Sequence, residues 1–116
     1  MTLFKTILAA TDFSAPADHA VTRAALLAQR HGARLGLVHV VNPSRFVRVR
    51  EWLAPSIDLG LQAARSRQRL QLLAEQLRAV HGVDTHFEVR SGNTFEELHR
   101  ASNRADLLVV GQRRRH

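Results

Sequence analysis

Three short segments each follow an apolar run and could carry chemistry. Thr11 and Asp12 end the first run, residues 40–42 end the second, and Val110-Gly111 ends the last. The Asp12 carboxylate can accept hydrogen bonds from a sugar hydroxyl or a base amine, or ligate Mg²⁺. Gly111 lacks a side chain, so a ligand could approach the backbone there. Plainer roles stay open, because Asp12 could cap the next helix and Gly111 could simply turn the chain.

The elements that must position these segments alternate along the chain. Apolar or alternating runs predict strands at residues 3–10, 35–41, 83–89 and 105–110. Between them, apolar residues recur at helical spacing. Alternation of strand and helix produces right-handed crossovers and a parallel sheet. The sequence therefore predicts an α/β fold, an open parallel sheet with helices on both faces. Ligands of such sheets bind beyond the carboxyl ends of the strands, where the strand order reverses.

Helix boundaries are marked by capping residues. Ser14 is expected to cap the first helix, and Gly32 and Gly82 are expected to end the first and second helices in the left-handed conformation. Asn93 or Thr94 is expected to cap a short third helix, because each is followed three residues later by a glutamate.

The second helix is harder to delimit. Residues 43–61 mix apolar residues with arginines, a proline and a glycine, which predicts a loop or broken helix. The helical period returns at about Gln62, and one face then carries Leu70, Leu73, Leu77 and Val80. Residues 83–89 alternate like a half-exposed edge strand, whereas 105–110 form a continuous run typical of a buried strand.

Length and composition bound the function. The 116 residues suffice for one domain, 1–116, and the absence of cysteine excludes disulfides and thiolate chemistry. No secretory leader and no membrane-length apolar stretch is present, so we expect a cytoplasmic protein without a membrane partner. No histidine pair has the spacing and carboxylate partner of a zinc site, and no nucleophile elbow or glycine-rich P-loop is found. We therefore predict no metal ligands and no catalytic residues.

The net charge of +7 comes almost wholly from arginine. Arginine suits phosphate, so a nucleic-acid or acidic-partner binder is one hypothesis. We do not favour nucleic acid, because the arginines are spread along the chain and few aromatic residues are available to stack on bases. The run 113–115 could grip phosphate groups or could be a solvated basic stretch.

Three segments together resemble the universal stress protein family. They are residues 7–14 (ILAATDFS), 37–41 (LVHVV) and 105–111 (ADLLVVG), and the resemblance covers essentially the whole chain. It implies a Rossmann-like sheet of strand order 3-2-1-4-5, related to the adenine-nucleotide α-hydrolase type, and often a homodimer. Here the order would be 3-2-1-4, because the sequence ends at His116 before a fifth strand. Asp12 and Gly111 would then face each other at the switch point.

The resemblance also implies a nucleotide site. In nucleotide-binding members, the end of the first strand contacts adenine and ribose, and a second-strand residue packs on the base. The corresponding positions here are Ala10, Thr11, Asp12 and Val40. Val110 and Gly111, at the end of the fourth strand, are also expected at the site, and Gly111 matches the first glycine of the family's phosphate loop. Ala10 stands where some binders carry proline. The family's phosphate loop runs Gly-x-x-Gly, nine residues, then Gly and Ser or Thr, but Arg114 occupies the second glycine position. Arg113 and Arg114 could contact phosphates instead.

Several functions follow from this resemblance. The first is a stress-response regulator with a pocket for ATP or another adenine nucleotide, with Mg²⁺ as companion and an altered phosphate loop. A second is a dimeric interaction module that binds no nucleotide. A third is a Mg²⁺-dependent adenine-nucleotide enzyme of related fold. In each case the fourth strand would lie at an open sheet edge, which further residues or a partner would have to cover.

Overall fold

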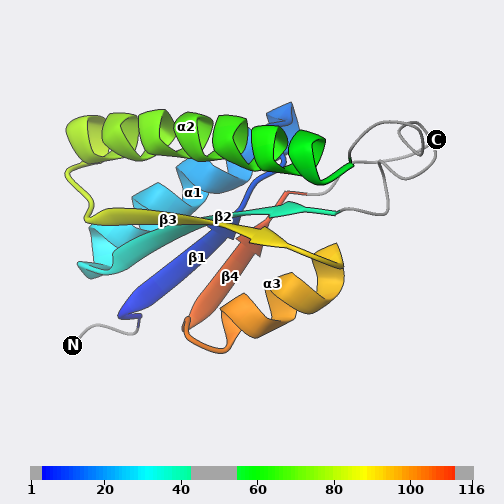
Figure 1. Cartoon of the computed structure of the whole chain (residues 1–116). Coiled ribbons are helices and arrows are strands. Elements are labelled where there is room, and N and C mark those ends of the chain that lie inside the picture. Colours follow the sequence, from blue (N-terminus) through cyan, green and yellow to red (C-terminus); the bar gives the residue numbers. More distant parts are fainter. Residues whose placement is uncertain (1–3, 43–54, 112–116) are drawn as a thin grey trace.

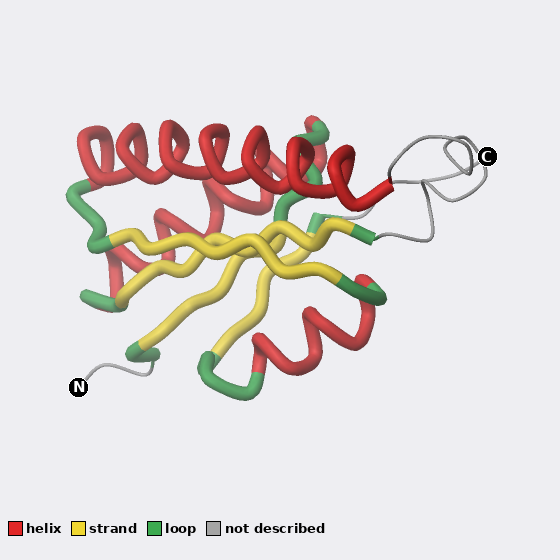
Figure 2. The backbone as a smooth tube through the Cα atoms, viewed as in Figure 1, coloured by secondary structure: helices red, strands yellow, loops and turns green. Residues whose placement is uncertain are grey.

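A computed structural model describes residues 4–42 and 55–111 and contains strands and helices in strict alternation (Figure 1). In chain order the elements are β1 (Thr6–Ala10), α1 (Ala15–His31), β2 (Arg34–Val41), α2 (Pro55–His81), β3 (Thr85–Ser91), α3 (Thr94–Ser102) and β4 (Leu107–Val110). The sheet lies between two layers of helices, with α1 and α2 on one face and α3 on the other (Figure 2).

The four strands form one parallel sheet in the order β3-β2-β1-β4. Ile7 of β1 lies beside Leu35 of β2 and Leu107 of β4, and Leu35 in turn lies beside Thr85 of β3. The predicted fold class and strand order are therefore confirmed. The alternating burial of β3, at one edge of the sheet, also matches its prediction as a half-exposed strand.

Most of the core lies between the sheet and helices α1 and α2. Ile7, Leu35 and Leu37 of the sheet are fully buried there, together with Val21 of α1 and Leu70 of α2. The remaining buried positions of α1 are alanines, whose small side chains let the helix backbone approach the sheet closely. The opposite face has a smaller apolar cluster under α3, formed by Leu8, Ala10, Val38 and Ala101.

The predicted caps are present. The Ser14 side chain accepts a hydrogen bond from the Ala17 amide, and Gly32 ends α1 with a φ of 63°. Of the two candidates for the third helix, Asn93 is the cap, because its side chain accepts a hydrogen bond from the Glu96 amide.

The second helix differs from its prediction. It begins at Pro55, so residues 55–61 are helical and not a loop or broken helix; residues 43–54 of that predicted segment lie outside the described part. Proline is tolerated in a first helical turn, and Gly60 costs only about 0.5–1 kcal/mol within a helix. Val80 is 74% exposed, because the buried stripe passes through Leu70, Ala74 and Leu77 and continues toward position 81.

Strand β4 is also less buried than its continuous apolar run predicts. Its first three residues are half-buried and Val110 is 49% exposed. The reason is its position, since among the described strands it pairs only with β1.

Asp106 joins the beginnings of the two strands β1 and β4. Its Oδ2 accepts hydrogen bonds from the backbone amides of Lys5 at 2.8 Å and Thr6 at 3.0 Å, and its own amide donates to the Thr6 carbonyl. The Lys5 amide foremost, and then the Thr6 amide, hold the pKa of the Asp106 carboxyl below its ordinary value.

This lowered pKa makes stability depend on pH in a defined direction. The ionised carboxylate stabilises the folded state above the ordinary carboxyl pKa, and that contribution is lost as the pH falls through the lowered folded pKa. Asp106→Asn should therefore unfold at lower urea than the natural protein at neutral pH, and the difference should shrink in acid. Urea midpoints measured across the acid range test this, with the exposed Glu75→Gln as control. A pH-independent difference would contradict the assignment.

Gly111, directly after β4, touches the first turn of α1. A Cβ built on it would lie 2.3 Å from the Pro16 carbonyl oxygen and 2.8 Å from the Ala17 amide nitrogen. These are backbone atoms, which cannot move aside without shifting the helix. The missing side chain thus lets α1 pack against the end of β4.

We therefore expect Gly111→Ala to destabilise the fold by about 1–3 kcal/mol, the usual cost of overpacking. Gly60→Ala is the matched control: a Cβ there meets nothing within 4 Å, and alanine should stabilise α2 by about 0.5–1 kcal/mol. Urea unfolding of both variants measures the contrast, and equal stabilities would refute the packing argument.

Candidate functional site

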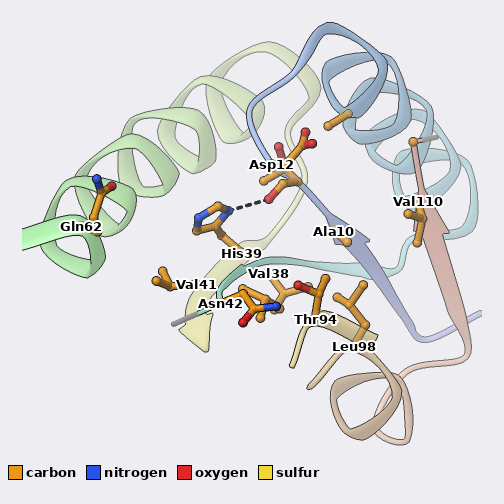
Figure 3. A pocket seen from close by; sticks show the side chains of 14 residues that line it. Ala10, Asp12, Val38, His39, Val41, Asn42, Gln62, Thr94, Leu98 and Val110 are labelled. Atoms are coloured by element: carbon orange, nitrogen blue, oxygen red, sulfur yellow. Dashed lines mark hydrogen bonds between the residues drawn. The ribbon is translucent and has the colours of Figure 1, made fainter. Parts of the chain in front are cut away.

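A cavity of about 270 Å³ lies at the carboxyl ends of β1 and β2 and beside the end of β4 (Figure 3). The ends of parallel strands meet there with the first residues of α3 and with Ala17 in the first turn of α1. This is the edge of the sheet where the topology predicts a ligand site.

The residues that the sequence assigned to a site come together here. Six of them line the cavity, namely Ala10, Thr11, Asp12, Val40, Val110 and Gly111. Arg113 and Arg114 lie outside the described residues. The shared location is a finding about geometry, whereas the binding role of these residues stays a prediction.

The cavity also involves residues that the sequence did not assign. Leu98 and Thr94 reach it from α3, and Gln62 reaches it from α2 (Figure 3). The predicted cap before residue 94 could have indicated the position of α3. A helix that begins just after a strand has its first turn at the carboxyl edge of the sheet, where that strand ends. Gln62 carried no comparable signal, because the segment before it was predicted to be a loop or broken helix.

Asp12 holds the turn between β1 and α1. Its Oδ1 accepts a hydrogen bond from the Ser14 amide at 2.9 Å, one residue before α1 begins. The helix cap itself is Ser14, so the plainer role considered for Asp12 is replaced by a tighter local turn. The exposed Asp12 side chain lies at the rim of the cavity (Figure 3).

Thr11 is buried and its polar atoms are used by neighbouring groups. Its amide donates to the Val38 carbonyl at 2.9 Å, and its hydroxyl oxygen accepts from the Phe13 amide at 2.9 Å. His39 Nδ1 lies 2.8 Å from the Thr11 carbonyl oxygen (Figure 3). Because a carbonyl can only accept, Nδ1 carries the proton in this hydrogen bond.

Phe13 has an unusual backbone and two partners. Its φ is 64°, a left-handed value that costs a bulky residue of order 1–3 kcal/mol and persists only where the surrounding structure enforces it. The His39 ring lies on Phe13 with centroids 4.8 Å apart, and the Arg69 guanidinium carbon lies 4.0 Å from the Phe13 ring centroid.

The walls of the cavity are chemically divided. Apolar side chains line it, including Val38, Val40 and Leu98, while polar groups such as Asp12 and Thr94 stand among them. Of the described residues that line it, none is a lysine or arginine. The arrangement can hold a flat apolar group and accept a hydrogen bond at a carboxylate, but it provides no described cationic side chain for phosphate.

Within residues 4–42 and 55–111, no group of three or more histidine, aspartate or glutamate side chains could hold a metal ion. In the same residues, no helix has the length and apolarity needed to cross a membrane.

Solved structures share this architecture. A protein of the universal stress protein family from Burkholderia pseudomallei superimposes with a TM-score of 0.80 at 28% identity, over 97% of this chain and 84% of that one. A universal stress protein in complex with cAMP superimposes with a TM-score of 0.65 at 23% identity, over 94% of this chain and 76% of that one. At that identity the second likeness shows the fold alone.

Sequence comparison agrees with the fold. A universal stress protein of Mycolicibacterium smegmatis is 32% identical over 114 aligned residues, which cover 92% of this chain but only 37% of the relative's length. The family model described as "Universal stress protein family" matches residues 3–116. The chain therefore belongs to the universal stress protein family.

Proposed function

We propose that the cavity binds the nucleoside part of an adenine nucleotide and that the chain acts in stress regulation through this binding. The observation that carries the proposal is the convergence of Asp12 with the apolar walls of β2 and α3 in one cavity. Val40 and Leu98 would contact the base, and Asp12 would accept a hydrogen bond from a ribose hydroxyl or a base amine.

The size of the cavity favours a small ligand. Its volume of about 270 Å³ is close to the lower end of ligand pockets, about 300 Å³. A base with its sugar suits such a space better than a whole nucleoside triphosphate. A universal stress protein of this fold has been solved in complex with cAMP, a small adenine nucleotide.

The described lining of the cavity offers few groups that could bind the phosphates of a nucleotide. Asp12 contributes a negative charge, and no described lysine or arginine lines the cavity. We therefore expect adenosine, AMP, cAMP and ATP to bind with similar affinities, with little help from Mg²⁺. Arg113 and Arg114, if they grip phosphates, would instead make ATP the tightest ligand and its binding strongly weakened by salt.

Substitution of Asp12 tests the proposal. Asp12→Asn retains an oxygen that can accept from the Ser14 amide but removes the charge, whereas Asp12→Ala removes both. Losing a hydrogen bond to a charged group should weaken binding about tenfold or more in both variants. Asp18→Asn, an exposed acid in the first turn of α1, is the matched control and should bind normally.

Calorimetric titration of AMP, cAMP and ATP into the natural protein and these variants gives the affinities. Saturable binding that both Asp12 variants weaken supports the proposal. No saturable binding of any of these ligands at millimolar concentration would defeat it. Phosphate release measured in the ATP and Mg²⁺ sample tests the enzyme hypothesis, which no described catalytic group supports.

A second proposal is a homodimeric interaction module, which the edge position of β4 favours. Among the described strands β4 pairs only with β1, and Val110 is 49% exposed, so the strand can accept a further partner. Sedimentation equilibrium over a range of concentrations measures self-association. A monomer at all concentrations would remove this candidate, whatever the nucleotide titrations give.

A further inference from the structure

The side chain of Phe13 connects the second helix to the turn that carries Asp12. Phe13 follows Asp12 directly, and its ring contacts two groups from other elements, the His39 ring of β2 and the Arg69 guanidinium of α2. A cation over the face of an aromatic ring is attracted by the ring quadrupole. The ring is half-buried and also packs against the main core cluster.

The backbone around Phe13 needs such support. Its φ of 64° is a conformation that bulky residues adopt only when the surroundings impose it. Two local hydrogen bonds, from the Phe13 amide to Thr11 Oγ1 and from the Ser14 amide to Asp12 Oδ1, define the turn but span only two residues each. Contacts with distant elements are what can hold it against relaxation.

His39 belongs to both parts of this arrangement. Its ring packs against Phe13, with the two planes tilted by 39°. Its Nδ1 donates to the Thr11 carbonyl, and the residue lines the cavity (Figure 3). The contacts of Phe13 with Arg69 and His39 therefore connect the exposed surface of α2 to the cavity wall.

We propose that Phe13, held by its contacts with His39 and Arg69, is a positioning residue that fixes the Asp12 carboxylate at the cavity, so that Arg69 acts on ligand binding without touching the ligand. Neither Phe13 nor Arg69 lines the cavity. The effect on a nucleotide rests on the function proposed above, whereas the effect on the turn can be measured in the free protein.

Arg69→Met is the most selective test. Methionine keeps a long unbranched side chain and a good helix former but removes the cation above the ring. Arg69→Lys keeps a cation and should retain much of the effect. Arg67→Met is the matched control, because it is exposed on the same helix and two residues away, on roughly the opposite side.

The first measurement uses no ligand. Hydrogen exchange of the Phe13 and Ser14 amides, followed by NMR, reports on opening of the turn. We expect Arg69→Met to raise both exchange rates about two- to fivefold, the size set by one exposed cation–π contact, and Arg67→Met to leave them unchanged. Phe13→Leu should raise them further and Phe13→Tyr should keep them near normal. Because this contact exists only in the folded state, the urea midpoint of Arg69→Met should also fall slightly below that of Arg67→Met.

The second measurement is nucleotide affinity in the same variants. Arg69→Met should weaken binding by at most this two- to fivefold factor, because affinity falls only with the fraction of molecules whose turn is open, and Arg69→Lys should largely restore it. Equal exchange rates in Arg69→Met and Arg67→Met would overturn the proposal. Faster exchange with unchanged affinity would overturn the claim that Arg69 acts on ligand binding, because its contact with Phe13 would then support the turn alone. If the natural protein binds no nucleotide, the proposed function fails, and the exchange rates alone decide whether these contacts fix the turn that carries Asp12.

Discussion

The hydrogen bonds of Thr11 are the constraint on which the site depends. This residue is buried where β1 ends and the chain reverses into α1, so each of its polar atoms needs a partner inside the protein. An unsatisfied buried group would cost about 1–3 kcal/mol. The amide is paired with the Val38 carbonyl, the carbonyl with His39 and the hydroxyl with the Phe13 amide. The direction of the following residues is fixed as a result.

The direction in which the chain leaves Thr11 determines both the packing of the Phe13 ring and the position of the Asp12 carboxylate. Because the Thr11 hydroxyl takes the Phe13 amide, Phe13 enters the left-handed region, and its ring turns to the side where His39 and Arg69 lie. The same turn directs the Asp12 carboxylate to the Ser14 amide and to the rim of the cavity. Contacts from β2 and α2 thus account for the strained backbone of Phe13, which lies next to the candidate binding residue Asp12.

Much of the fold followed from the sequence, because its signals are local. The alternation of apolar runs and helical periods, and the caps at Ser14, Gly32 and Asn93, depend on neighbouring residues only. The start of α2 did not follow, because Pro55 and Gly60 resemble helix breakers although a first turn tolerates proline and a long helix tolerates one glycine.

The site was predictable where it depends on topology and not where it depends on tertiary contact. Parallel strands bring their carboxyl ends together, so the strand ends at Asp12, Val40 and Gly111 had to lie at one edge. No pattern could show that Gly111 packs on the Pro16 carbonyl, or that Arg69, far along the chain, lies over Phe13. Such contacts depend on where separate helices finally dock.

The net charge of the chain and the Asp12 carboxylate at the described cavity have opposite signs. A net charge of +7 favours the approach of anions at long range, an effect that salt screens. At the described cavity, however, a ligand would meet a carboxylate and apolar walls, with no lysine or arginine among the described lining residues. Under the proposed function, the positive net charge would attract the phosphates of a nucleotide at long range, and the described lining would contact its base and sugar.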